Sequence, residues 1–207
     1  MILVTGFWPY KEVFNASGEL IESLKSDLPQ ELESIKDELV FEVLSCDITS
    51  RETEHQTLEA KLLELLELYQ PEMCIFTGQA PAYNRVTIEK IGINSFMSEK
   101  IDPQRPAAFW SNLHGLDELQ TELEKQEIPA DYSYNAGQSL CNHILYSSLY
   151  FAEAMNLSHN SVFIHIPVLP KQIISTHPKS ACMPLDMTRK ALTIIITHAM
   201  KQRVKLE

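Results

Sequence analysis

Short runs of strand-forming residues alternate with longer segments of helical periodicity, and this alternation restricts the possible folds more than any other feature of the chain. Strands are predicted at 2–5, 39–48, 73–77, around 132 and at 162–166, with an irregular hairpin or strand pair at 86–93. Helices are predicted at 18–28, 52–69, 107–126, 138–155 and 185–203. Strands and helices on separate segments indicate an α/β fold, a doubly wound α/β/α sandwich with a mostly parallel central sheet.

Composition limits the size of the core and the classes of partner. The 207 residues are 44% hydrophobic, and no Pro/Gly/Ser-rich linker divides them, so a single domain over residues 1–207 is expected. The net charge is −11, with acidic residues spread along amphipathic segments. Nucleic acids and anionic membranes attract basic patches, so neither is expected as a partner.

Targeting signals and cysteine usage favour a cytoplasmic protein. The N-terminus has no positively charged region before its short apolar run, and no apolar stretch reaches the roughly 18 residues that span a bilayer. The four cysteines lie far apart without a CxxC pair and are expected to be thiols. We found no dinucleotide fingerprint, P-loop or spaced His/Cys set, so no cofactor and no metal are expected.

Cys141 is the first candidate for chemistry, because it lies at the start of a predicted helix after a strand and a glycine-containing turn. In open parallel sheets, ligands bind beyond the carboxyl ends of the strands. A helix N-terminus offers unpaired N–H groups and a positive dipole end, which stabilise a thiolate and can hold an oxyanion. The alternative is a small buried residue on the core face of the helix.

His165 is the candidate base, because it ends a predicted strand and would point into the same crevice. Its alternative is a hydrogen-bonded core histidine. His143 competes with it, but residues two apart on a helix do not share a face, so His143 cannot easily reach the thiol. Glu89, within an apolar alternation, could orient the imidazole, and Asp102 could serve instead.

Five blocks of sequence resemble the pyroglutamyl peptidase I (pyrrolidone-carboxylate peptidase) family. The opening VTGFWPY is similar to the family's VTGFDPFG, GQA…TIEKIGIN to GQAGGR…ITPERVAIN, and PAAFW to PAAYW. The block IPA…NAGQSLCNH is similar to IPA…TAGTFVCNH, and FIHIPVLP to FIHVPYLP. The blocks occur in order over nearly the whole chain, and together they are a specific signal.

The resemblance implies a cysteine peptidase that hydrolyses the bond after an N-terminal pyroglutamyl residue through a thioester. It places Cys141, His165 and Glu89 on the family's nucleophile, base and orienting acid. Family members are soluble, cofactor-free and often tetrameric, so a homo-tetramer or homodimer is expected. The substrate-binding candidates are two aromatics, an amide and an apolar residue: Phe7, Tyr10, Gln79 and Leu140. The amide of Gln79 offers both the donor and the acceptor that a lactam needs.

Three loops depart from the family pattern. Its Gly-Gly-Arg is replaced by 81–83 (Pro-Ala-Tyr), the approach to the nucleophile differs at 138–140, and a Pro-Asp-Asn-Glu-Gly stretch is shortened at 101–104. The catalytic positions are retained while the substrate loops differ. Two other functions therefore remain open: a small-molecule binding protein without peptidase turnover, and a thiol amidase for a different acyl group.

Overall fold

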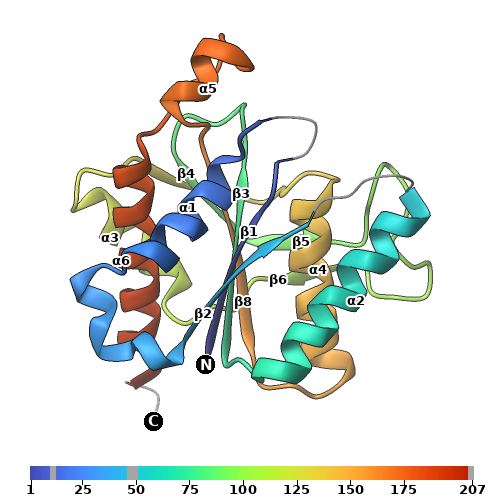
Figure 1. Ribbon diagram of the computed structural model, residues 1–207. Helices are drawn as coiled ribbons and strands as arrows, with labels where there is room; N and C mark the ends of the chain where they lie inside the picture. The colour runs from blue at the N-terminus through green and yellow to red at the C-terminus, as the bar shows by residue number, and fades with distance from the viewer. Residues whose placement is uncertain (10–12, 46–50, 205–207) are drawn as a thin grey trace.

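The computed structural model describes residues 1–9, 13–45 and 51–204, with the side chains of 51–56 left out of the description. Its centre is a six-stranded sheet in the order β2-β1-β3-β8-β4-β7 (Figure 1). The strands are β1 (Ile2–Phe7), β2 (Leu39–Leu44), β3 (Met73–Gln79), β4 (Val86–Glu89), β7 (Ala130–Ser133) and β8 (Asn160–Ile166).

The first four strands of that order run parallel, and their carboxyl ends meet at one edge of the sheet. Residue 165 lies beside Gly78 in the β3–β8 register, so His165 emerges at this edge. β4 is antiparallel to β8 and parallel to β7. Glu89, the last residue of β4, therefore pairs with Phe163, two residues before His165, and lies deeper in the sheet than the rim.

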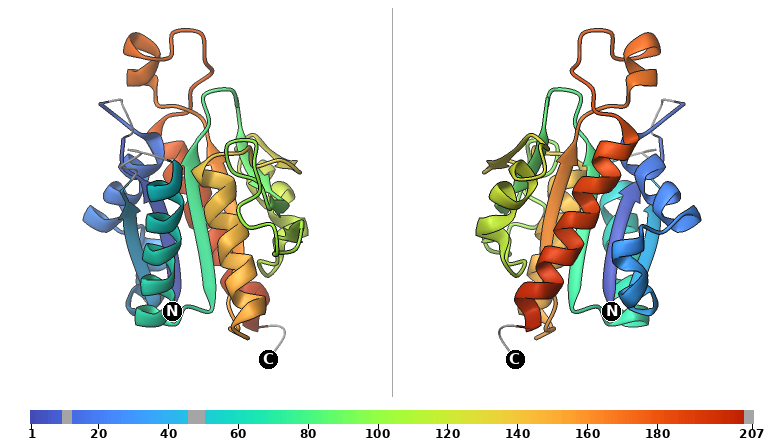
Figure 2. Two further views of the ribbon diagram at one scale, coloured as in Figure 1. Left: turned by 90° about the vertical axis from the view of Figure 1, so that its right-hand side faces the viewer. Right: turned by 90° about the vertical axis from the view of Figure 1, so that its left-hand side faces the viewer.

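Helices cover both faces of the sheet, as Figures 1 and 2 show. One face carries α1 (Ala16–Ser26), α3 (Leu119–Glu124) and α6 (Leu185–Val204), and the other carries α2 (Arg51–Tyr69) and α4 (Leu140–Ala154). Each face has its own apolar core, because alternate strand residues point to opposite sides. A small two-stranded sheet of β5 (Ile91–Ile93) and β6 (Ala108–Trp110) packs against α4. The predicted fold class is confirmed.

Two sequence predictions about elements are wrong. The predicted helix at 107–126 begins late: β6 pairs with β5, and only a 3-10 turn (Leu116–Glu118) and α3 are helical. Gly115, at φ +69°, turns the chain before that 3-10 segment, so the helix cannot extend backwards. The predicted hairpin at 86–93 is absent, because β4 joins the large sheet and β5 joins the small one.

Two short helical elements were not foreseen, and one strand prediction runs past the described residues. The 3-10 segment Gln30–Glu38 precedes β2, and α5 (Pro170–Ser175) projects beyond the carboxyl edge of the sheet (Figure 1). The predicted strand at 39–48 ends at Leu44 in the structure, and residues 46–48 lie outside the described part.

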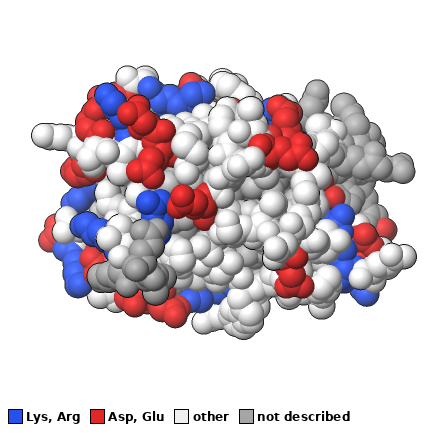
Figure 3. Space-filling view, turned by 90° about the horizontal axis from the view of Figure 1, so that it is seen from below, with Lys and Arg blue, Asp and Glu red and all other residues white. Residues whose placement is uncertain are grey.

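Charge is unevenly distributed at the end of the molecule opposite that edge. Seen from below, acidic and basic groups lie mainly around the rim, and a broad uncharged area occupies the middle (Figure 3). Among the described residues, none of the helices has the length and apolar character needed to cross a membrane.

Candidate active site

The thiol of Cys141 lies in the first turn of α4, above the carboxyl end of β3. The N-cap residue Ser139 makes no side-chain capping bond, and the first backbone hydrogen bond of α4 runs from the His143 N–H to the Ser139 carbonyl at 3.0 Å. The N–H groups of Leu140, Cys141 and Asn142 thus have no acceptor within the helix. A negatively charged atom at this position would receive hydrogen bonds and the favourable end of the helix dipole.

Gly78 makes room for the thiol. A Cβ atom at residue 78 would lie 3.0 Å from Cys141 Sγ and 2.5 Å from Cζ of Phe163. Any side chain at this position of β3 would collide with the Cys141 thiol or with the Phe163 ring. The glycine is needed here for close approach of α4 to the sheet and not for a special backbone angle.

Asn142 holds the start of α4 in place, and the sequence reasoning missed it. Its Oδ1 accepts from the Ile93 N–H at 2.9 Å, and its Nδ2 donates to the carbonyls of Ile93 and Ser95 at 2.9 and 2.7 Å. The side chain is fully buried. A buried amide with all these bonds fixes α4 against the small sheet. The signal available in the sequence was an asparagine next to the nucleophile in an otherwise apolar helix.

His165 is buried, and the two predicted partners lie on either side of it. Its Nδ1 is 2.7 Å from Glu89 Oε1. Burial lowers the pKa of His165, but the negative charge and hydrogen bond of Cys141, together with the Glu89 carboxylate, outweigh it and raise the pKa to about 9. The imidazole is therefore protonated at neutral pH, with one N–H toward the carboxylate and the other available to the thiol.

The structure brings Glu89 to the imidazole and leaves Asp102 elsewhere. Glu89 is fully buried beneath the ring, because antiparallel β4 places it inside the sheet face. Asp102 belongs to a turn: its Oδ1 accepts from the Gln104 N–H at 2.8 Å, and its Oδ2 lies 3.3 Å from Arg105 Nε. Asp102, the predicted alternative acid, is thus committed to that turn and has its cationic partner there.

His143 faces a different group of charges. Its Nε2 lies 3.5 Å from Glu59 Oε1, which also binds Arg105 Nη1 at 2.6 Å and Ser147 Oγ at 2.7 Å. Burial raises the pKa of Glu59, but the bonds from His143, Arg105 and Ser147 prevail and lower it to about 2. This buried cluster joins α2 to α4. The geometry agrees with the expectation that residue 143 points away from the thiol.

Three of the four substrate-binding candidates, Phe7, Gln79 and Leu140, lie in the described part of the structure. Phe7 and Leu140 belong to the same apolar cluster, which Cys141 also contacts. Tyr10 lies outside the described residues. Gln79 Oε1 already accepts from the Ala16 N–H at 2.8 Å and from Gln172 Nε2 at 2.7 Å. Both of these bonds are made by the Gln79 oxygen.

The described cysteines differ sharply in environment. Cys74, Cys141 and Cys182 are all free thiols, and Cys46 lies outside the described residues. Burial raises the pKa of Cys74 to about 12, which keeps it an unreactive thiol. Cys182 is exposed at the surface. Cys141 is the cysteine placed beside an imidazole.

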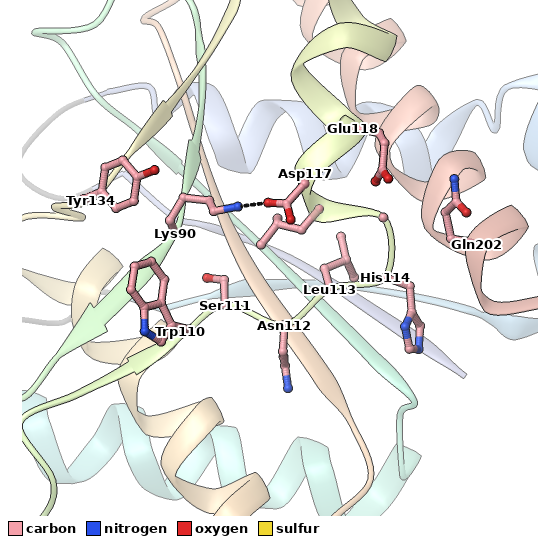
Figure 4. A pocket seen from close by; sticks show the side chains of 12 residues that line it. Lys90, Trp110, Ser111, Asn112, Leu113, His114, Asp117, Glu118, Tyr134 and Gln202 are labelled. Carbon is pink, nitrogen blue, oxygen red and sulfur yellow. Dashed lines mark hydrogen bonds and ion pairs between the residues drawn. The ribbon is translucent and has the colours of Figure 1, made fainter. Parts of the chain in front are cut away.

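One cavity is a separate feature. It measures about 900 Å³ and lies at the sheet edge around Lys90, Trp110 and Asp117, with Lys90 and Asp117 paired across it (Figure 4). None of the thiol, imidazole or Glu89 carboxylate lines it. Its link to the site is Ser111, whose Oγ donates to the Glu89 carbonyl at 2.7 Å. Within residues 1–9, 13–45 and 51–204, no group of three His, Cys, Asp or Glu side chains could hold a metal ion.

These features define a class of protein. A thiol at a helix N-terminus, a buried imidazole hydrogen-bonded to a carboxylate, and an unoccupied set of backbone N–H groups are the parts of a cysteine hydrolase. They are mounted at the carboxyl edge of an α/β/α sheet.

Comparison with known proteins narrows this class. Residues 1–202 match the pyroglutamyl peptidase family. The chain is 32% identical to a pyrrolidone-carboxylate peptidase of Brachyspira hyodysenteriae, over 94% of this chain and 96% of that protein. It is also similar to two solved structures. A mutant pyrrolidone carboxyl peptidase from Pyrococcus furiosus has a TM-score of 0.81 at 26% identity, covering 97% and 98% of the chains. Pyroglutamyl peptidase I from Bacillus amyloliquefaciens has a TM-score of 0.81 at 28% identity, covering 96% and 93%.

The chain belongs to the pyroglutamyl peptidase family of cysteine-type exopeptidases. The resemblance seen in the sequence is confirmed, and so is the class of enzyme that it implied.

Proposed function

We propose that this enzyme removes pyroglutamate from peptide N-termini, with Cys141 as nucleophile, His165 as general acid and base, and Glu89 as the group that orients His165. One observation carries the assignment of roles: the thiol over Gly78 and the carboxylate 2.7 Å from Nδ1 flank a single buried imidazole. Packing alone does not require a thiol, an imidazole and a carboxylate from distant parts of the sequence to lie side by side in this order, whereas nucleophilic catalysis does.

The acyl pocket suits a neutral lactam. Phe7 and Leu140 supply apolar walls beside the thiol. The Nε2 of Gln79 donates to the lactam carbonyl, because its Oε1 is already held by Ala16 and Gln172. An apolar site with few fixed polar groups is typical of small-ligand recognition. Tyr10 stays a proposed wall of this pocket on the strength of the family resemblance alone.

The reaction follows from the geometry. The Cys141 thiolate attacks the carbonyl carbon of the exocyclic amide, and the N–H groups at the start of α4 stabilise the resulting oxyanion. The His165 imidazolium gives its proton to the leaving amine as the C–N bond breaks, which leaves a pyroglutamyl thioester. The neutral imidazole then takes a proton from water, whose hydroxide attacks the thioester and releases pyroglutamate. Each oxyanion donor of this kind contributes about 2.7–4 kcal/mol to lowering the barrier. The side chains and backbone supply every group, and no cofactor is required.

The test is hydrolysis of a fluorogenic pyroglutamyl amide beside the matching prolyl amide, with and without prior iodoacetamide. We expect release from the pyroglutamyl compound alone, abolished by alkylation and by Cys141→Ala, with Cys182→Ala as the matched control that retains activity. Near-full activity of Cys141→Ala would refute the assigned nucleophile. Release from neither compound, with Cys141 still readily alkylated, would favour a repurposed pocket for a different acyl group.

We also propose that the enzyme works in the cytoplasm on peptides, as a homodimer or homotetramer. Exposed Cys182, a free thiol, fits a reducing compartment. The projecting α5 presents Ile174 with 89% of its surface exposed, and an apolar side chain on an arm is suited to contact with a second copy. Light scattering on the purified protein tests the assembly: a monomer mass at micromolar concentration would contradict it.

A further inference from the structure

A second cavity lies next to the position of His165, because Thr87, which lines the cavity, pairs with His165 between β4 and β8. It measures about 550 Å³, within the range of roughly 300–1,000 Å³ that is usual for ligand pockets. Its lining includes Tyr83, Arg85, Thr87, Asp131 and Tyr134. Tyr83 reaches back to the catalytic group: its ring meets the ring of His165 edge-on, with 5.5 Å between centroids.

The strand registers place this cavity in line with the catalytic groups. Gly78 pairs with His165, His165 with Thr87, and Thr87 with Asp131. Paired residues direct their side chains to the same face of a sheet, which here is the α4 face. From β3 to β7, the order across the sheet is therefore the thiol over Gly78, the imidazole of His165, and then Thr87 and Asp131, which line the cavity.

The chemistry of the reaction assigns the two sides. The attacked carbonyl carbon is bonded to the lactam ring on one side and to the leaving amine on the other. The ring and the rest of the peptide must therefore extend from the thiol in different directions. The acyl candidates Phe7 and Gln79 end β1 and β3. The leaving amine receives its proton from His165, so the rest of the peptide departs on the β8 and β4 side, where the cavity lies.

We propose that this cavity is the subsite for the first residue of the leaving peptide, and that it favours an uncharged aromatic side chain there. The inference rests on the proposed function. Tyr83 and Tyr134 line the cavity. The ring of Tyr134 contacts the ring of Trp110 edge-on, with 6.1 Å between centroids, and Figure 4 shows these two side chains. The charges in it pair with each other, because Arg85 Nη1 lies 3.7 Å from Asp131 Oδ2. Because these charges pair with each other, the two phenol rings that line the pocket favour flat apolar side chains over ions.

The family resemblance does not supply this subsite. Tyr83 replaces the arginine of the family's Gly-Gly-Arg, in a loop where two glycines are also lost. The aromatic wall nearest the base is thus a feature of this chain's own sequence. A specificity for the residue after pyroglutamate would follow from the same substitution.

The experiment compares pyroglutamyl-phenylalanine amide with pyroglutamyl-glycine amide, and uses pyroglutamamide, whose hydrolysis releases pyroglutamate and ammonia, to test cleavage of the exocyclic amide separately. We expect kcat/KM of the wild type to favour the phenylalanine compound by roughly tenfold, the size of one to two aromatic contacts. Tyr83→Ala and Tyr134→Ala should each reduce that ratio at least threefold, and Tyr83→Phe should retain it. Tyr69→Ala, at the far end of α2, is the matched control that should leave the ratio unaltered.

A second readout excludes an indirect effect through the base. In a Cys141→Ala background, which binds without turnover, the ratio of the two Kd values should fall in parallel for both tyrosine variants. Phenylalanine-to-glycine ratios within twofold of wild type in both variants would overturn the proposed subsite. An equal loss of rate on both compounds would also overturn it, because it would mean that Tyr83 only positions His165. Failure of the wild type on pyroglutamamide would instead refute the proposed function, and with it the inference that depends on it.

Discussion

Replacing Gly78 by alanine should disable the enzyme while leaving it folded. The new methyl group would lie 3.0 Å from Cys141 Sγ and 2.5 Å from Phe163 Cζ, whereas carbon atoms in contact prefer about 3.5–4.0 Å. Both groups must therefore retreat by roughly 0.5–1 Å. Phe163 is fully buried and packs on the imidazole at 4.7 Å between ring centroids, so its movement also displaces His165.

Two measurements follow from this displacement. A misplacement of about 1 Å at reacting atoms costs on the order of 100-fold in rate, so kcat/KM for a pyroglutamyl amide should fall by about that factor. Overpacking of a buried site costs about 1–3 kcal/mol, which urea unfolding would detect. Gly115→Ala is the control. Residue 115 has φ +69°, and its new methyl group would meet His198 of α6, which covers the face of the sheet opposite α4. It should lose stability but keep its kcat/KM. Activity of Gly78→Ala within threefold of wild type would refute the proposed packing of α4 on β3.

Three further predictions concern charge and positioning. The pKa of His165 is raised to about 9 and its protonated form is the active one, so kcat/KM should decline as pH rises through about 9. Glu89→Gln should move this decline to lower pH, because it removes the carboxylate that binds Nδ1. A decline at the same pH in the variant would contradict the pairing of Glu89 with His165. The pKa of Glu59 is lowered from 4.5 to about 2, so Glu59 contributes roughly 3 kcal/mol of stability above pH 4.5 that is lost as pH falls toward 2. Glu59→Gln should be less stable than wild type in urea at pH 7, by a margin that narrows in acid, and a constant margin would exclude this origin. Gln172→Leu should raise KM for a pyroglutamyl amide up to tenfold with kcat little changed, since Gln79 loses the donor that orients its amide; an unchanged KM would refute that role.

Much of the fold was predictable because the spacing of apolar residues determines the type of its longer helices and strands. The helix at 52–69 and the strands at 2–5 and 73–77 are dominated by local patterns that the tertiary structure follows. The segment at 107–126 failed for the opposite reason: Ala108–Trp110 is too short to have a pattern of its own, and its pairing with β5 decides its conformation. The direction of β4, a strand of four residues, is likewise fixed by its neighbours.

The site was predictable where strand ends and helix starts bear reactive residues. A helix start and a strand end made Cys141 and His165 candidates, and the family resemblance was needed to favour them over the alternative of core residues. Glu89 could not be separated from Asp102 without the registry between β4 and β8, which buries one carboxylate under the ring and leaves the other in a turn. Asn142 has no reactive signature, and only its three bonds to the small sheet reveal its role.

The position of β8 bears on when the enzyme becomes active during its synthesis. β8 is the last strand in the sequence, yet it lies between β3 and β4 in the middle of the sheet. Before residues 160–166 leave the ribosome, β3 and β4 have no strand to join them, and the thiol of Cys141 has no base. Long-range pairings of this kind form late because loop closure must precede them. A nascent chain therefore carries the Cys141 thiol without its imidazole partner until the C-terminal part of the protein has emerged.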